Sequence, residues 1–146
     1  MKTYKVAIGS DHAGFDYKSQ IILYLKNKNF TIIDKGCYDA EKADYPDYAH
    51  EVAASILNKD VDFGILLCGS GNGISITANK HKGIRSAICW KPEIAEMARK
   101  HNNANILTLP ARYISLDDAY HCVDTFLSNE FEGGRHADRV NKIEIC

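Results

Sequence analysis

The sequence predicts an α/β protein, a three-layer sandwich in which helices cover both faces of a five-stranded, mostly parallel sheet. Short apolar runs alternate with longer amphipathic segments along the whole chain. Two of the longer segments carry a proline at their start, Pro46 and Pro92, which suits a first helical turn. One short run, FGILL at 63–67, is apolar throughout, as is typical of a strand buried on both faces.

The first part of the chain predicts two strands and two helices. Tyr4–Gly9 (YKVAIG) is predicted as a strand because it is apolar, contains β-branched residues and ends at a glycine. Phe15–Asn27 has apolar residues at helical spacing, and Phe30–Asp34 (FTIID) is predicted as the second strand. Pro46–Leu57 is predicted as a helix, because its apolar residues form one stripe.

The rest of the chain continues the alternation. The strand Phe63–Leu67 is followed by a glycine-rich turn and a helix through about Lys80. The later strands and helices are predicted at Arg85–Cys89, Pro92–Lys100, Ala104–Leu109 and Leu116–Leu127, and the tail after Gly133 and Gly134 is predicted to be helical as far as Lys142. There is no repeat, low-complexity tract or linker, so residues 1–146 are expected to form a single domain.

Composition narrows the possible functions. A net charge of -1, from 18 basic and 19 acidic residues, argues against a nucleic-acid or membrane-surface role driven by charge. The sequence has no apolar run long enough for a membrane span or signal peptide, so we expect a cytoplasmic protein. An odd number of irregularly spaced cysteines predicts free thiols and not disulfides, and the lack of a CxxC pair argues against a structural zinc site. The cysteines are Cys37, Cys68, Cys89, Cys122 and Cys146.

Polar residues follow the first and third predicted strands, and parallel sheets bind ligands beyond the carboxyl ends of their strands. Asp11 and His12 follow the first strand, where they form either a turn pair or a site for sugar hydroxyls and phosphate. Cys68 follows the third strand and precedes a helix. The helix dipole and the backbone amides at this position favour a thiolate, the form of cysteine that acts as a base or nucleophile. The alternative is that Cys68 is a small buried side chain with no chemical role. The other cysteines are assigned to that buried class.

The segment GSGNG at 69–73 is a candidate anion site. Its glycines Gly69, Gly71 and Gly73 let the backbone approach a ligand and turn its amides toward a phosphate or an oxyanion. The segment matches neither a dinucleotide fingerprint nor a Walker loop. The alternative is an ordinary turn between a strand and a helix.

A second polar group lies between a helix and the fifth strand, beginning at His101. This position is at the opposite end of the sheet, so His101 could join the first group only from a neighbouring subunit; it is either an acid–base group or a solvated histidine near a helix end. Arg135 and Arg139 are spaced to share one helix face, which suits either a bound phosphate dianion or a solvated basic surface. Arg112, after the fifth strand, is a third candidate of this kind.

Taken in order, several segments resemble the ribose-5-phosphate isomerase B family, which also includes galactose-6-phosphate isomerase subunits. The matching segments are GSDHAGF, DYPDYA, ILLCGSGNGISITANK, GIRSAIC, HNNANIL and EGGRHADRV. The resemblance implies a Rossmann-like fold without a nucleotide, metal or other cofactor. It also implies a homodimer, in some cases a dimer of dimers, with active sites at the subunit interface. The implied reaction is the reversible isomerisation of ribose 5-phosphate to ribulose 5-phosphate in the pentose phosphate pathway.

The resemblance also implies roles for individual residues. Cys68 would be the base that moves a proton between carbon 1 and carbon 2, assisted by Ser70. His101 would help to open the furanose ring, and Asp11 would bind the sugar near the reacting end. The other implied roles are enediolate binding by Gly69, Gly71, Gly73 and Asn102, phosphate binding by His12, Arg112, Arg135 and Arg139, and pocket lining by Tyr45 and His136.

Two positions depart from the family pattern: Ser70 stands where many members carry threonine, and Asn72 replaces a commonly apolar residue. Two other functions stay open. One is the same chemistry on a six-carbon sugar phosphate, such as allose or galactose 6-phosphate. The other is a non-catalytic sugar-phosphate-binding protein, for which Cys68 and His101 would not be required.

Overall fold

A computed structural model describes residues 2–145. Cys146, predicted to be a free thiol, lies outside these residues. The strands are β1 (Lys5–Ser10), β2 (Thr31–Asp34), β3 (Phe63–Cys68), β4 (Ser86–Ile88) and β5 (Ile106–Pro110). The helices are the short 3₁₀ helix η1 (His12–Gly14) and the α-helices α1 (Phe15–Lys26), α2 (Tyr45–Leu57), α3 (Asn72–Asn79), α4 (Pro92–Lys100), α5 (Leu116–Ser128) and α6 (Arg135–Val140).

The strands form one sheet in the order β2-β1-β3-β5-β4, and every neighbouring pair is parallel. The apolar strand β3 therefore lies at the centre, between β1 and β5. Parallel neighbours with helices between them confirm the predicted α/β fold class.

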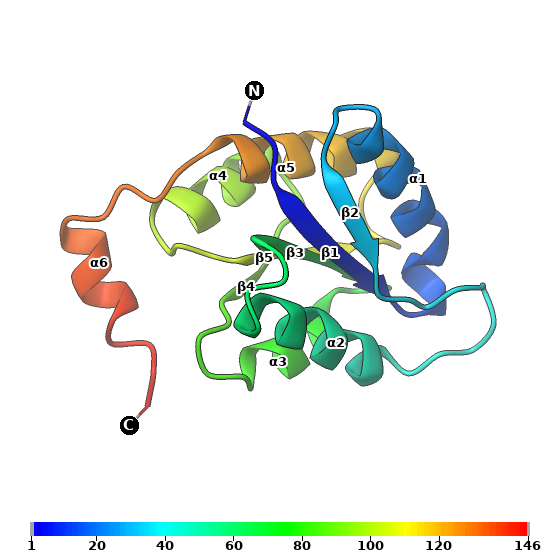
Figure 1. Cartoon of the computed structure of the whole chain (residues 1–146), viewed down its shortest axis with the longest axis horizontal. Helices are drawn as coiled ribbons and strands as arrows, with labels where there is room; N and C mark the ends of the chain where they lie inside the picture. The colour runs from blue at the N-terminus through cyan, green and yellow to red at the C-terminus, as the bar shows by residue number, and fades with distance from the viewer. Residues whose placement is uncertain (1, 146) are drawn as a thin grey trace.

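Alternate side chains of the central strands enter two separate cores. Ile65 and Leu67 of β3 pack with helices α1, α4 and α5, whereas Leu66 and Cys68 pack on the other face with α2 and α3. Figure 1 shows the resulting layers, with α1, α4 and α5 on one side of the sheet and α2 and α3 on the other. A strand with a core on each face has no room for polar side chains, which explains the unbroken apolar run at 63–67.

Several predicted elements were too long at one or both ends, including the last helix and the fourth strand. The last helix ends at Val140 and not at Lys142, because the amides of Lys142 and Ile143 bond three residues back in a tighter turn. The strand predicted at Arg85–Cys89 is confined to Ser86–Ile88, although the Cys89 amide still bonds the Thr108 carbonyl. Both differences fall at element ends, where patterns are least decisive.

Helix α6 stands apart from the two helical layers, joined to α5 by an extended segment (Figure 1). None of its residues is buried. Within residues 2–145, no helix combines the length and apolarity needed to cross a bilayer.

Candidate active site

The carboxyl ends of β1, β3 and β5 bring the first polar group together. The register pairs Ser10 with Leu67 and Cys68 with Pro110, so the residues that follow these strands emerge at one edge of the sheet. Backbone bonds continue past the strand ends: the Asp11 amide donates to the Leu67 carbonyl at 3.3 Å, and the Ala111 amide to the Cys68 carbonyl at 2.9 Å. Asp11, Cys68 and Arg112, which follows Ala111, therefore lie near one another at this edge.

Cys68 is the last residue of β3 and keeps 4% of its surface exposed. Its side chain lies on the face covered by α2 and α3, in contact with the core that contains Ile74. Since α3 begins at Asn72, the cysteine lies next to the start of that helix. These contacts place the thiol at the end of the buried strand β3, at the edge of the sheet where the first polar group lies.

The loop after Cys68 positions the start of α3. Gly71 caps this helix with φ of +80°, a left-handed conformation that glycine adopts without strain. The backbone amide and the side-chain amide of Asn72 both donate to the Ser70 hydroxyl at 3.3 Å. Ser70 and Asn72 are the two positions that depart from the family pattern. The polar side chain of Asn72 therefore binds the hydroxyl of Ser70. Unpaired amides at a helix start form a ready anion site.

Glycines of this loop also leave room for two side chains of the predicted site. A Cβ at Gly69 would stand 3.3 Å from Nη1 of Arg112, and the Arg112 amide donates to the Gly69 carbonyl at 3.0 Å. A Cβ at Gly73 would stand 2.5 Å from Cζ of Tyr45. Any other residue at position 73 would displace the tyrosine, so this glycine is required for the close approach.

Asp11 and His12 lie in the turn that follows β1. Asp11 is nearly buried, and its Oδ1 caps η1 by accepting the Gly14 amide at 3.1 Å. Nδ1 of His12 is held by the backbone of Ala43: the Ala43 amide donates to it at 3.2 Å, and the Ala43 carbonyl lies 3.3 Å away. The other ring nitrogen, Nε2, is left for a phosphate or hydroxyl group at this edge.

The second polar group centres on His101, which caps the carboxyl end of α4. Its ring stacks on His136 with centroids 4.1 Å apart, and its Nε2 lies 3.3 Å from Oε1 of Glu132. The same Oε1 lies 3.8 Å from Nε2 of His136. Desolvation, and then the charge of His101, hold the pKa of His136 below its ordinary value. Glu132 was not predicted as a site residue; its spacing of four from His136 in the EGGRH segment was the available signal.

Among residues 2–145, His101, Glu132 and His136 are the group whose ligand atoms lie close enough, within 4.8 Å of one another, to consider a metal ion. Two imidazoles and a carboxylate are a donor set found in zinc enzymes. The two ring planes, however, are stacked and only 11° from parallel. Their in-plane lone pairs run side by side and do not converge, so at least one ring would have to rotate to share an ion.

The arginines of α6 and Asn102 complete this second group. Arg135 and Arg139 are exposed, and within the described part of the chain neither forms an ion pair. Asn102 is also exposed and lines a hollow of about 600 Å³, whose other lining residues include Arg85 and Glu144. The free guanidinium groups are available to an anion.

The two groups lie at opposite ends of the sheet. Gly64 pairs with Ile106 at one end of the β3–β5 ladder, and Cys68 pairs with Pro110 at the other. Four residues of strand separate these pairs by about 13 Å, and His101 lies beyond the Ile106 end. A single copy of the chain therefore does not bring the two groups of the predicted site together. For His101, this was expected from its position in the sequence between α4 and β5.

The fold and the two groups can be compared with known proteins. A family model described as Ribose/Galactose Isomerase matches residues 6–143. Ribose-5-phosphate isomerase B of Escherichia coli is 45% identical over 139 residues, covering 95% of this chain and 93% of that protein.

Two solved structures extend the comparison. A ribose 5-phosphate isomerase from Thermotoga maritima has a TM-score of 0.96 and 53% identity, covering 97% of this chain and 98% of that one. Ribose-5-phosphate isomerase B from Mycoplasma genitalium, solved with bound ribulose-5-phosphate, has a TM-score of 0.90 and 42% identity, covering 95% and 93%. The chain belongs to the Ribose/Galactose Isomerase family.

Proposed function

We propose that this chain interconverts ribose 5-phosphate and ribulose 5-phosphate, with Cys68 as the base. The observation that carries the proposal is the place of Cys68, at the end of the central strand and beside the start of α3. The relatives named above are called ribose-5-phosphate isomerases, and one was solved with ribulose-5-phosphate bound. Family membership and the position of the thiol point to the same reaction.

The chemistry needs one base that reaches two neighbouring carbons. The Cys68 thiolate takes the proton from carbon 2 of the open-chain aldose, and the electron pair moves to the carbonyl oxygen on carbon 1, which gives an enediolate. The proton of the carbon-2 hydroxyl then moves to the oxygen on carbon 1, and the thiol returns its proton to carbon 1 as the carbon-2 oxygen becomes the ketone. Backbone amides of the 69–73 loop, with Ser70 nearby, stabilise the negative oxygen.

Substrate binding draws on both polar groups. Asp11 and His12 at the sheet edge bind the sugar and the phosphate, and Arg112 supplies a positive charge over Gly69. His101 assists ring opening, with Glu132 near its Nε2. Arg135 and Arg139 bind the phosphate dianion, for which guanidinium groups suit bidentate contacts. Remote binding energy of this kind positions the reacting carbons.

Because these groups lie at opposite ends of one sheet, we propose that the active site forms between two copies of the chain. Helix α6, which stands apart with exposed arginines, would reach the Cys68 edge of the second copy (Figure 1). A dimer with two equivalent sites satisfies this arrangement. We place the enzyme in the cytoplasm, since a thiol base needs a compartment that keeps cysteine reduced.

The test is an isomerase assay of the purified protein with ribose 5-phosphate, in the presence and absence of a chelator. We expect turnover in both, with solvent deuterium incorporated into the sugar and turnover strongly reduced in Cys68→Ser. Parallel assays with allose 6-phosphate and galactose 6-phosphate separate a six-carbon preference. Ribose 5-phosphate binding without any deuterium exchange would refute catalysis and favour a binding protein.

A further inference from the structure

A lysine is buried in the core-facing side of α1. Lys18 is 1% exposed, although it lies on the same stripe as the buried Ile21 and Leu25. Its ammonium group lies 2.6 Å from Oδ1 of Asp34, which ends β2 and is 38% exposed. A buried charge costs desolvation that an apolar side chain of similar length would avoid. Packing of α1 alone therefore does not account for a lysine here.

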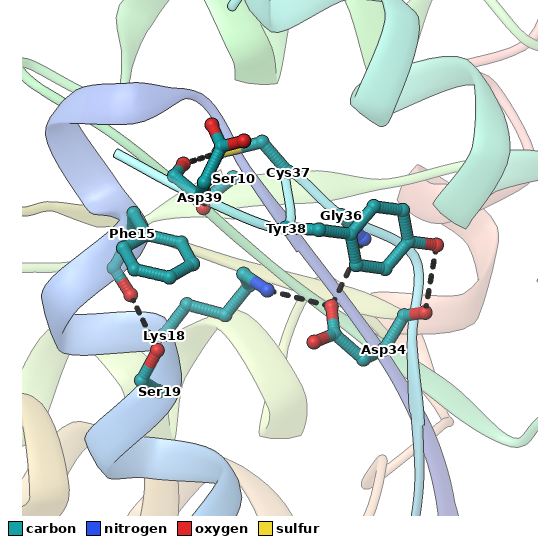
Figure 2. A network of polar contacts seen from close by, with 9 residues as sticks. All are labelled: Ser10, Phe15, Lys18, Ser19, Asp34, Gly36, Cys37, Tyr38 and Asp39. Carbon is teal, nitrogen blue, oxygen red and sulfur yellow. Dashed lines mark hydrogen bonds and ion pairs between the residues drawn. The ribbon is translucent and has the colours of Figure 1, made fainter. Parts of the chain in front are cut away.

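The Lys18–Asp34 pair is part of a larger polar network (Figure 2). Oδ1 of Asp34 also accepts the amide of Gly36 at 2.9 Å, and its backbone carbonyl accepts the Tyr38 hydroxyl at 3.3 Å. The ammonium group lies 5.5 Å from the ring centroid of Phe15 and 5.9 Å from that of Tyr38. The ammonium group of Lys18 thus holds the carboxylate of Asp34, and the segment after β2 is hydrogen-bonded to that carboxylate.

That segment, residues 35–44, is bonded at both ends to the turn that carries the sugar-binding residues. At its start, the Ser10 amide donates to the Gly36 carbonyl at 2.7 Å, and the Cys37 amide donates to the Ser10 carbonyl at 2.8 Å. Ser10 directly precedes Asp11. At its end, the Ala43 amide donates to Nδ1 of His12 at 3.2 Å.

We propose that Lys18 is a positioning residue for the sugar-phosphate site. Through Asp34 and Gly36 it fixes the 35–44 segment, and the segment fixes the backbone before Asp11 and the ring of His12. Without the ammonium group, the half-exposed carboxylate turns toward water and releases the Gly36 amide. The inference rests on the proposed function for its kinetic part only, because the orientation of His12 can be measured without turnover.

The chain offers a matched control for this test. Lys28 follows the other end of α1 and pairs with Asp124 at 2.9 Å, far from the edge where β1 and β3 end. Lys18→Met and Lys28→Met each remove one ammonium group and keep a long side chain. We expect Lys18→Met to raise the KM for ribose 5-phosphate about tenfold with a smaller change in kcat, and Lys28→Met to leave both constants unchanged.

Two further measurements separate positioning from stability. The ¹⁵N resonances of the His12 imidazole should shift in Lys18→Met and not in Lys28→Met. In the double variant Lys18→Met/Asp34→Asn, the neutral amide can still accept the Gly36 amide without a buried charge, so KM should return toward the wild-type value. Lys18→Arg keeps the charge and tests the same point if the single methionine variant does not fold.

A Lys18→Met protein with lowered thermal stability but wild-type KM and wild-type His12 resonances would overturn the inference. So would failure of both the double variant and Lys18→Arg to recover KM. If the wild-type protein shows no isomerase activity, the proposed function fails, and the His12 resonances alone then decide whether Lys18 positions this ring.

Discussion

The guanidinium group of Arg112 lies against the backbone of Gly69, so that a Cβ at Gly69 would stand 3.3 Å from Nη1. The two residues are also joined through the backbone, by the Arg112 amide and the Gly69 carbonyl at 3.0 Å. A positive charge from the end of β5 is thereby held over the first residue of the glycine-rich loop, next to Cys68.

Gly69→Ala should therefore raise the KM for ribose 5-phosphate several-fold, because the new methyl group pushes the guanidinium away from its place. The fold should persist, since the contact is with the far end of a flexible side chain. The control is a double-variant cycle with Arg112→Ala, measured by steady-state kinetics. If Gly69→Ala is equally harmful with Arg112 already removed, the contact is not the cause.

Cys68→Ser should lower kcat for isomerisation by about 10²–10⁴-fold, the usual contribution of a positioned acid–base group. The small change in volume should leave the melting temperature within a few degrees, as circular dichroism would report. Cys89→Ala serves as the matched control, because Cys89 is fully buried in the other core. Wild-type turnover by Cys68→Ser would remove this thiol from the mechanism.

A site shared between two copies predicts complementation. Cys68→Ala and His101→Ala should each be inactive alone, but a random mixture of their subunits should regain about a quarter of wild-type activity, since half the dimers are mixed and each has one intact site. The measurement is activity after the two purified proteins are unfolded and refolded together. No recovery, with mixed dimers present by native mass spectrometry, would place both residues in a site within one chain.

Arg139→Ala should raise the KM for ribose 5-phosphate by about 10- to 100-fold, as expected for a lost hydrogen bond to a charged group of about 1.5–3 kcal/mol. The effect on kcat should be smaller, because the phosphate is remote from the reacting carbons. Lys142→Ala is the control, since Lys142 is an exposed cation just beyond α6. Equal changes in the two variants would indicate a general charge effect and not a phosphate contact.

Stability should fall at alkaline pH because of two buried thiols. Desolvation raises the pKa of Cys89 and of Cys122 from 9.0 to about 12. Between these values the unfolded chain releases protons that the folded chain keeps, so the free energy of unfolding falls by about 1.4 kcal/mol per pH unit for each thiol. Below pH 9 this contribution is fully present.

Urea unfolding of the wild type and of Cys89→Ala/Cys122→Ala at pH 8 and pH 10.5 checks this expectation. The double variant should start less stable, because its core has lost volume, but should lose less stability between the two pH values. Parallel declines in the two proteins would show that other groups, such as the half-buried Tyr24 hydroxyl, set the alkaline limit.

The helices and strands were largely predictable from the sequence, because each has a strong local signal. The unbroken apolar run of β3, the proline near the start of α2 and the Ser115 cap of α5, whose hydroxyl accepts the Asp118 amide, need only neighbouring residues to be interpreted. Their ends were less certain, as β4 and α6 show.

Lys18 marks the limit of such patterns. Its spacing from Ile21 and Leu25 places it on an apolar stripe, yet its charge suggests the solvent side. Only its partner, sixteen residues away in Asp34, resolves the conflict, and that partner is brought near by the pairing of β2 with β1. The role of Glu132 beside His101 was hidden for the same reason.

By itself, the sequence determined the alternation of strands and helices, the family, and the identity of the chemical groups, since these depend on residue type and on spacing along the chain. Tertiary structure alone decided which of those groups meet. The strand order placed Asp11, Cys68 and Arg112 at one edge and His101 at the other, because parallel strands bring all their carboxyl ends to the same side of a sheet. Contacts between residues distant in sequence are set by packing and strand pairing, which local spacing does not record.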